Sequence, residues 1–440
     1  MVSTAVRDRS LAELADELSL DFFLVSYTDL LGGTRSKLVP ASQIAPVEKE
    51  GAFFAPFASN LGLGPDAHDI AAIPDPKSLI VLPWKPNVGW LASDVYIDGA
   101  PYAAAPRVIF KSVLSQCQAL GYQYKTGVEA EFFLLKQTDK GYEIADSKDT
   151  ASRPCYDQLN LMRQFDFIST LVGYMEGLGW GPYQCDHEDA NGQFEINWTY
   201  DDALVTADRH VFFKYMVKTL AEQRGLTATF MPKPFSHLTG NGAHIHMSLW
   251  SGETNAFADA AGELGLSTLG YEFLAGVLSH ARGLSALCTP TVTSYKRLSA
   301  ADSVSGSCWA PRYVSYGGNN RTHMIRIPDG GRFECRLLDG ASNLYLALAG
   351  LLAAGLEGVT HHLQPGDRLD ENMYVRGSEF DLVSLPANLL EGLQCLQDDA
   401  LIMNTLGDAA AKLFIDFKTG EWNAYNAAIT PWEIEHYINC

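Results

Sequence analysis

Four segments of this 440-residue chain alternate polar with strongly apolar residues, which is the pattern of β-strands that have one polar face. A single strand of this kind is typical of a solvated sheet surface, but four of them predict one shared polar cavity. The segments are VEAEFFLL (128–135), GQFEINW (192–198), GNGAHIHMSLW (240–250) and RFECR (332–336). Their polar faces carry Glu129, Glu131, Glu195, Asn197, His244, His246, Ser248, Arg332, Glu334 and Arg336, and Glu188 lies just before the second segment.

Carboxylates dominate this predicted cavity, and burying several of them without cations would be too costly. Oxygen and nitrogen donors without cysteine suit Mg²⁺ or Mn²⁺ better than zinc. The number of carboxylates exceeds what one ion needs, so two or three divalent ions are expected. The candidate metal ligands are Glu129, Glu131, Glu188, Glu195, His244 and Glu334.

Five arginines accompany these acids in or near the same segments. Guanidinium groups bind carboxylate and phosphate oxygens in pairs and stay charged at any working pH. Divalent ions and arginines around one cavity are what phosphoryl transfer requires. No GxxxxGK[ST] or GxGxxG phosphate loop is present, so metals and arginines would hold a nucleotide. The arginines are Arg297, Arg321, Arg326, Arg332 and Arg336.

Composition excludes several classes of partner. The net charge of -20 disfavours nucleic acid as a partner. No apolar run approaches the roughly 20 residues that cross a membrane, and the charged first ten residues do not resemble a secretion signal. Eight scattered cysteines without a CxxC pair indicate reduced thiols and a cytoplasmic protein.

The length suits two domains, which we place at residues 1–105 and 106–440. The segment at 11–20 predicts a helix, the one at 21–30 a strand, and the one at 106–121 a helix that ends at Gly121. Strands and helices alternate irregularly, which favours an α+β fold. The nearly all-apolar segment 341–359 predicts a buried helix.

The chain resembles the glutamine synthetase family. The resemblance rests on VEAEFFL, the HED…GQFEI region, ATFMPKPF, GNGAHIHMSL, TPTVTSYKRL, NNRTHMIRIP, RFECRLLDGASNLYLALAGLLAAGLEG and TPWEIEHY, which follow one another in the family's order. It implies a small N-terminal β-grasp domain and a larger catalytic α+β domain with a curved antiparallel sheet. It also implies a homo-oligomer, usually a dodecamer of two stacked hexameric rings, with each active site between subunits.

The resemblance also implies an ATP-dependent reaction in which glutamate becomes γ-glutamyl phosphate and an amine displaces the phosphate. One metal site would use Glu131, Glu188 and Glu195, and the other Glu129, His244 and Glu334. ATP would contact His246, Ser248, Arg321, Arg326 and Arg332. Glutamate would contact Gly240, Arg297 and Arg336. The residues implied in catalysis are Arg297, Arg321, Arg336, Asp69, Asp302 and Tyr156.

The region around the amine departs from the family pattern. Relatives that use ammonia carry an aspartate in a loop whose counterpart here, FAPFASNLGLG (54–64), has no acid. Asp69 remains nearby, Asp302 is the acid nearest to the expected flap glutamate, and Tyr156 matches a tyrosine of the amine pocket. A missing carboxylate disfavours NH₄⁺ and leaves room for a methyl group, as in the type III-like branch that contains γ-glutamylmethylamide synthetases.

Methylamine is therefore the expected amine. Ammonia is the alternative, with Asp69 or Asp302 as the base, and a larger amine such as a polyamine is a second one. A catalytically inactive ring-forming protein is disfavoured by the complete set of metal-ligand candidates. NMY (372–374) resembles the start of the adenylylation loop of some relatives, so modification of Tyr374 is a further hypothesis.

Overall fold

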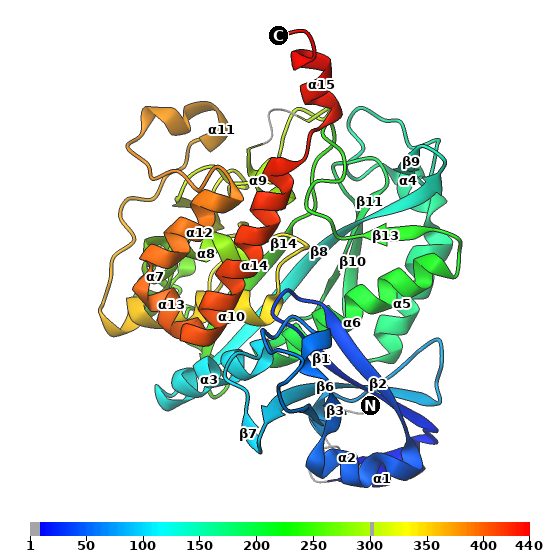
Figure 1. Cartoon of the computed structure of the whole chain (residues 1–440). Coiled ribbons are helices and arrows are strands. Elements are labelled where there is room, and N and C mark those ends of the chain that lie inside the picture. Colours follow the sequence, from blue (N-terminus) through cyan, green and yellow to red (C-terminus); the bar gives the residue numbers. More distant parts are fainter. Residues whose placement is uncertain (1–8, 300–302) are drawn as a thin grey trace.

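The computed structural model describes residues 9–299 and 303–440 as a mixed α+β fold with two sheets (Figure 1). The smaller, N-terminal sheet has the strand order β2-β1-β6-β4-β3, with β5 and β7 also paired to β6. Strand β1 runs parallel to β6, and helices α1 and α2 lie against this sheet. These elements are α1 (Leu11–Leu18), β1 (Phe22–Thr28), β2 (Thr34–Pro40), η1 (Ala41–Gln43), α2 (Ile44–Glu50), β3 (Ala52–Phe54), η2 (Pro56–Ala58), β4 (Ile70–Pro74), η3 (Pro76–Ser78), β5 (Ile80–Val81), β6 (Val88–Ile97) and β7 (Ala100–Pro101).

The larger sheet is built around β8, which spans 16 residues and pairs with β11, β14, β9, β12 and β13. Its main path is β10-β11-β8-β14-β18-β17-β16, and all but the last pair are antiparallel. The predicted α+β class and curved antiparallel sheet are confirmed. The strands are β8 (Gln123–Thr138), β9 (Gly141–Ile144), β10 (Pro182–His187), β11 (Gln193–Trp198), β12 (Asp201–Asp202), β13 (Thr227–Thr229), β14 (Ala243–Ser251), β15 (Thr254–Asn255), β16 (Tyr316–Gly317), β17 (Ile325–Arg326) and β18 (Phe333–Cys335).

Helix α10 (Leu344–Thr360) is the apolar helix expected from the sequence, and it is buried on nearly all sides. It packs closely on α7, because a Cβ at Gly276 would meet the Ala354 carbonyl oxygen at 2.0 Å. The remaining helices are α3 (Pro106–Ala119), α4 (Gln158–Arg163), α5 (Phe165–Gly177), α6 (Ala203–Glu222), η4 (Glu263–Gly265), α7 (Thr268–Ser279), α8 (Ala281–Cys288), α9 (Val292–Leu298), α11 (Met373–Arg376), η5 (Gly377–Glu379), α12 (Leu389–Asp398), α13 (Ala400–Leu406), α14 (Asp408–Ala427) and α15 (Pro431–Tyr437).

A buried arginine joins the N-terminal sheet to the helices behind the large sheet. Arg107 on α3 is 4% exposed and donates to Asp94 on β6 at 2.7 Å. It also donates to Asp75 at 2.8 Å and to Asp208 on α6 at 2.9 and 3.0 Å. The Tyr345 hydroxyl on α10 donates to Asp208 at 2.6 Å. Segments far apart in the chain thus meet on one guanidinium. The boundary near residue 105 stays a prediction.

The C-terminal helix α15 projects from the rest of the chain (Figure 1). Its apolar side chains are exposed, with Trp432 at 55%, Ile434 at 51% and Tyr437 at 56%. Across residues 9–299 and 303–440, no helix combines the length and apolarity needed to cross a membrane.

His280 supplies a pH-dependent link between helices. It lies between α7 and α8, where its Nδ1 is 2.8 Å from Asp399 and its Nε2 contacts Glu357 of α10. The hydrogen bond to Asp399 is the main cause that raises its pKa. A raised folded pKa stabilises the fold below the unfolded value near 6.5, and this stability is lost as pH rises through the folded pKa.

We therefore expect the thermal unfolding midpoint to fall as the pH rises above about 6.5 at constant ionic strength. The His280→Asn variant should be less stable than the wild type at the lower pH and approach it at the higher one. His361→Asn, at an exposed site, is the control. Parallel pH profiles for His280→Asn and the wild type would contradict the assignment.

Candidate active site

The register of the large sheet brings acids from several strands side by side. We call Glu129, Glu131, Asp186 and Glu195 the acidic row. Glu131 on β8 lies opposite Glu195 on β11, and Glu195 lies opposite Asp186 on β10. On the other side of β8, Glu129 lies opposite His244 of β14. Side chains opposite one another in neighbouring strands share a face. Antiparallel pairing therefore turns four distant sequence segments into one surface.

Glu334 on β18 forms the inner edge of this surface. It is fully buried, and Arg326 and Arg336 each donate to one of its oxygens, at 2.6 and 2.5 Å. The Nδ1 atom of His244 lies 3.4 Å from Glu334 and 3.7 Å from Glu129. Burial opposes ionisation of Glu334, but Arg336 and the two histidines outweigh it and lower its pKa to about 2. Glu334 is thus a fixed negative charge.

A cavity of about 400 Å³ is lined by all of these side chains except that of Glu334. Ser248 lines an adjoining cavity. Asp69 is exposed just before β4 and lines neither cavity, and Asp302 lies outside the described residues. The predicted residues that line the larger cavity are Glu129, Glu131, Tyr156, Glu188, Glu195, Gly240, His244, His246, Arg297, Arg321, Arg326, Arg332 and Arg336.

The donor atoms of this cavity suit divalent cations. Burial and the neighbouring Glu131 raise the pKa of Glu188 to about 8, and burial with Glu129 and Glu188 raises that of Glu195. Carboxylates crowded in this way are stabilised by a bound cation, and oxygen-rich sites select Mg²⁺ or Mn²⁺. Three groups of possible ligand atoms, each within 4.8 Å, occur among the described residues: Glu129, Glu195 and His244; Glu129, His246 and Glu334; Asp186, Glu188 and Glu195.

Asp186 and Asp189 are site residues that sequence reasoning missed. Asp186 lines the cavity beside Glu188. The sequence feature that could have identified it is its spacing of two residues from Glu188. Asp189 is buried and accepts hydrogen bonds from Trp309 Nε1 at 2.7 Å and from Thr239 at 2.9 Å. Asp189 thereby links the loop at 303–309 to the acidic row. No local sequence pattern predicts this contact.

Glu131 is oriented by hydrogen bonds from behind. Its Oε2 accepts from Gln193 Nε2 at 2.9 Å and from the Gly242 backbone at 2.8 Å. Its Oε1 lies 4.0 Å from Nδ1 of His244. One carboxylate oxygen is therefore held by the protein while the other remains directed at the cavity.

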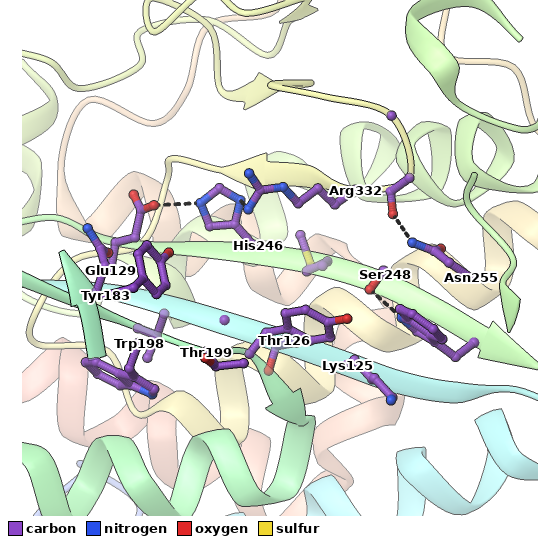
Figure 2. A pocket seen from close by; sticks show the side chains of 18 residues that line it. Lys125, Thr126, Glu129, Tyr183, Trp198, Thr199, His246, Ser248, Asn255 and Arg332 are labelled. Carbon is purple, nitrogen blue, oxygen red and sulfur yellow. Dashed lines mark hydrogen bonds and ion pairs between the residues drawn. The ribbon is translucent and has the colours of Figure 1, made fainter. Parts of the chain in front are cut away.

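Figure 2 shows the adjoining cavity, of about 320 Å³, with His246, Arg332 and Glu129 on the side shared with the first. Its far end has aromatic walls, where Trp250 stacks on Tyr200 at 6.2 Å and Lys125 Nζ lies 4.5 Å from the Trp250 ring centre. A flat aromatic base stacks well in such a space. Because the two cavities share Glu129, His246 and Arg332, we describe them together as one channel with an aromatic end and an acidic end.

Arg297 marks the other end of this channel. It is 3% exposed, and its Nη1 donates to the Leu337 carbonyl at 3.1 Å. No carboxylate lies within ion-pair distance of it among the described residues. Gly240 packs beside it, since a Cβ there would meet the Pro232 carbonyl at 2.2 Å and Arg297 Cγ at 3.2 Å. A buried guanidinium without a carboxylate partner is suited to bind a carboxylate ligand.

Two tyrosines border this end. Tyr156 lines the cavity in a left-handed conformation, with φ at 61°, and burial together with Cys155 and Glu188 raises its pKa to about 12. The Tyr374 hydroxyl is buried without a hydrogen-bond partner among the described residues. Modification of Tyr374 stays a prediction, and it would require the surrounding loop to open first.

A family comparison decides the identity. Residues 103–437 match the model of the glutamine synthetase catalytic domain. The chain belongs to the glutamine synthetase family. It is 51% identical over 426 residues to a glutamine synthetase of Rhizobium meliloti (strain 1021), covering 96% of this chain and 98% of that protein.

Another relative of this glutamine synthetase family member is named for a different amine substrate. The chain is 42% identical over 430 residues to a glutamate–methylamine ligase of Methyloversatilis universalis, covering 96% of this chain and 97% of that protein. It also matches a solved structure described as a GmaS/ADP complex, with a TM-score of 0.94 and 55% identity, covering 98% of this chain and 100% of that one. The chain is thus an ATP-dependent glutamate–amine ligase, the activity expected from the sequence.

Proposed function

We propose that this ligase joins the γ-carboxylate of glutamate to methylamine through γ-glutamyl phosphate. The observation that supports methylamine is the acid-free segment 54–64, because a missing carboxylate removes a charge that favours NH₄⁺ and leaves apolar room for a methyl group. The 55% identity to GmaS over nearly the whole chain points the same way. A free carboxylate is a poor acyl donor, so transfer of the ATP γ-phosphate supplies the leaving group.

ATP is proposed to lie along the channel. Its base would stack between the aromatic residues around Trp250, near Ser248, and its phosphates would reach His246 and Arg332 at the shared edge. Arg321 and Arg326 would neutralise the transferred phosphate, because guanidinium forks match phosphate oxygens. Two or three Mg²⁺ or Mn²⁺ ions, held by the acidic row and His244, would lower the repulsion between the phosphates and the glutamate carboxylate.

Glutamate is proposed to bind at Arg297 and Gly240, with Arg336 behind them. The buried guanidinium of Arg297 lacks a carboxylate partner within the described part of the chain, so the glutamate carboxylate would supply one. This placement directs the γ-carboxylate toward the acidic row, where the cations hold the nucleotide. The amine would enter beside Tyr156 and displace phosphate from the activated carbonyl.

The amine is tested by measuring ADP release with ammonia, methylamine, ethylamine and putrescine at saturating ATP and glutamate. The value of kcat/KM is expected to be highest for methylamine, because an apolar pocket gains from burying one methyl group, worth about tenfold or more. Ammonia measured at equal concentration of the unprotonated amine is the control. A larger kcat/KM for ammonia would refute the methylamine assignment.

Ammonia is the second candidate, favoured by the 51% identity to the Rhizobium meliloti glutamine synthetase. In that case Asp69 or Asp302 would act as the base. Asp69 is exposed and lines neither cavity of its own chain, so it is proposed to act on the site of a neighbouring subunit. Loss of ammonia-dependent turnover in Asp69→Asn would support this candidate.

A homododecamer of two stacked hexameric rings is the proposed assembly, as is typical of the family. The exposed apolar side chains of α15 support an intersubunit contact there. The position of segment 54–69, away from the cavity of its own chain, supports a site completed by a neighbour. A cytoplasmic location is proposed as well, supported by eight free cysteines.

A further inference from the structure

A separate cavity of about 280 Å³ lies where the N-terminal sheet meets the helical side of the large sheet. It is bordered by the turn between β1 and β2, by one face of α6 and by the beginning of α10. None of the residues that line it lines either cavity of the active site. We call it the junction cavity.

Three nitrogen-bearing side chains of α6 face the junction cavity at four-residue intervals, so they lie on one side of the helix. Lys214 donates to the Gly340 carbonyl at 2.7 Å, which uses one of its three N–H groups. Lys218 has no hydrogen bond or ion pair with any residue that the structure describes. His210 is 3% exposed, and its Nδ1 is buried without a partner. The side chains of Lys218 and His210 therefore bring to this cavity nitrogen atoms that no described residue satisfies.

Burial makes this arrangement costly as long as no anion is present. It is the main cause that lowers the pKa of Lys214 to about 8 and, with Lys214 nearby, that of His210 to about 3. A neutral imidazole still donates one N–H, so His210 contributes a donor without a charge.

The N-terminus of α10 adds a third source of positive potential. Ser342, Asn343 and Leu344 line the cavity at the start of this 17-residue helix. Asn343 does not cap the helix with its side chain, because its Nδ2 donates to the Asp29 carbonyl at 3.1 Å. The free backbone N–H groups of a first turn and the helix dipole both favour an anion. The unpartnered Asn343 Oδ1 could accept from a protonated oxygen of such a ligand.

The acids around the cavity are mostly compensated already. Asp29 accepts from Arg35 and Asn60, and Asp208 is paired with Arg107. Asp339 is buried, accepts a hydrogen bond from the Ala341 backbone at 2.9 Å, and its charge opposes the lowering of the Lys214 pKa. In a chain with a net charge of -20, a cavity with two lysines and a helix N-terminus is therefore a local positive site.

We propose that the junction cavity binds a small anion with at least two negative charges, of the hydrogen phosphate or dicarboxylate type. The anion would lie between Lys214 and Lys218, with its far oxygens at the first turn of α10. The cavity volume of about 280 Å³ is large enough for either probe. This inference does not depend on the ligase reaction, because it concerns a site that shares no residue with the channel.

Isothermal titration calorimetry with potassium phosphate and with succinate, at constant ionic strength and without ATP or metal, tests the proposal. The full-length protein, Lys218→Gln and the exposed-site control Lys140→Gln are compared. The same comparison is repeated with Arg321→Gln present in every protein, because this substitution reduces binding of the probes in the active-site channel. In that background Lys218→Gln is expected to weaken binding about tenfold, since a charged partner is lost, while Lys140→Gln leaves it unchanged.

Lys218 is exposed at the helix surface, so its substitution is not expected to unfold the protein, and His210→Gln supplies a second variant. Binding of phosphate alone would assign a phosphorylated ligand, and binding of succinate alone a dicarboxylate. The proposal would be overturned if Arg321→Gln and the double variant Arg321→Gln/Lys218→Gln bound a probe with equal affinity. It would also be overturned if neither probe bound. Loss of ligase activity in Arg321→Gln bears only on the proposed function.

Discussion

Replacing Glu131 with glutamine is expected to reduce kcat by roughly 10³-fold or more. The substitution keeps the shape and removes one negative charge from the acidic row. The backbone N–H of Gly242 can still find an oxygen acceptor in the amide, so the local fold is expected to persist. The variant would lose a negative charge that is proposed to hold a divalent cation against the phosphate in the transition state.

The measurement is ADP release with saturating glutamate, amine and Mg²⁺, repeated at raised Mg²⁺ to separate weak metal binding from lost catalysis. Glu143→Gln is the matched control, because it makes the same change on β9 of the same sheet at an exposed site. Unchanged thermal unfolding without added metal would show that the fold is intact. Wild-type turnover in Glu131→Gln would refute the metal-site role of this residue.

Replacing Arg107 with methionine is expected to destabilise the fold by about 3–5 kcal/mol. Methionine nearly matches the length of the side chain but leaves Asp75, Asp94 and Asp208 without their shared cation. Lys111 contacts Asp94 and would compensate only that carboxylate. The remaining buried charges would either repel one another or take up protons. The stability of Arg107→Lys should lie between those of the wild type and Arg107→Met, because an ammonium group keeps the charge but cannot reproduce all four hydrogen bonds.

Thermal and urea unfolding at fixed protein concentration test this expectation, since assembly contributes to apparent stability. Arg368→Met is the control, because it breaks only exposed surface pairs with Glu263 and Asp370, which contribute little to stability. Lowering the pH toward 4 should narrow the difference between Arg107→Met and the wild type, as protonation relieves the repulsion among the aspartates. An Arg107→Met variant as stable as the control would show that the cluster is not a structural link.

The acidic row could be predicted from the sequence because strand periodicity is local. Glu129, Glu131 and His244 sit at alternate positions of apolar strands, and the sheet register then only had to bring those faces together. The helices at 11–20 and 106–121 were predictable for the same reason, and the structure places them at Leu11–Leu18 and Pro106–Ala119.

Contacts between distant segments could not be predicted in this way. Asp75, Asp94 and Asp208 each look like ordinary surface charges, and only the fold shows that one guanidinium joins them. Asp186 was missed because PYQCDH, the strand that carries it, lacks an apolar face to mark the alternation. The junction cavity likewise combines a turn, one face of a helix and a helix N-terminus that lie far apart in the chain.

The proposed phosphate-binding and amine-binding residues lie on different kinds of structural element, and this affects how such proteins diversify. His244 and most of the acids that would handle phosphate lie on paired strands, whereas the segments proposed to lie near the amine, 155–156 of the same chain and 54–64 of a neighbouring subunit, lie largely outside strands. Loops accept substitutions more readily than a paired sheet. Nitrogen-donor preference can therefore drift along a lineage while the energy-coupling chemistry stays constant, which is why overall identity alone is a poor guide to the amine that any one member uses.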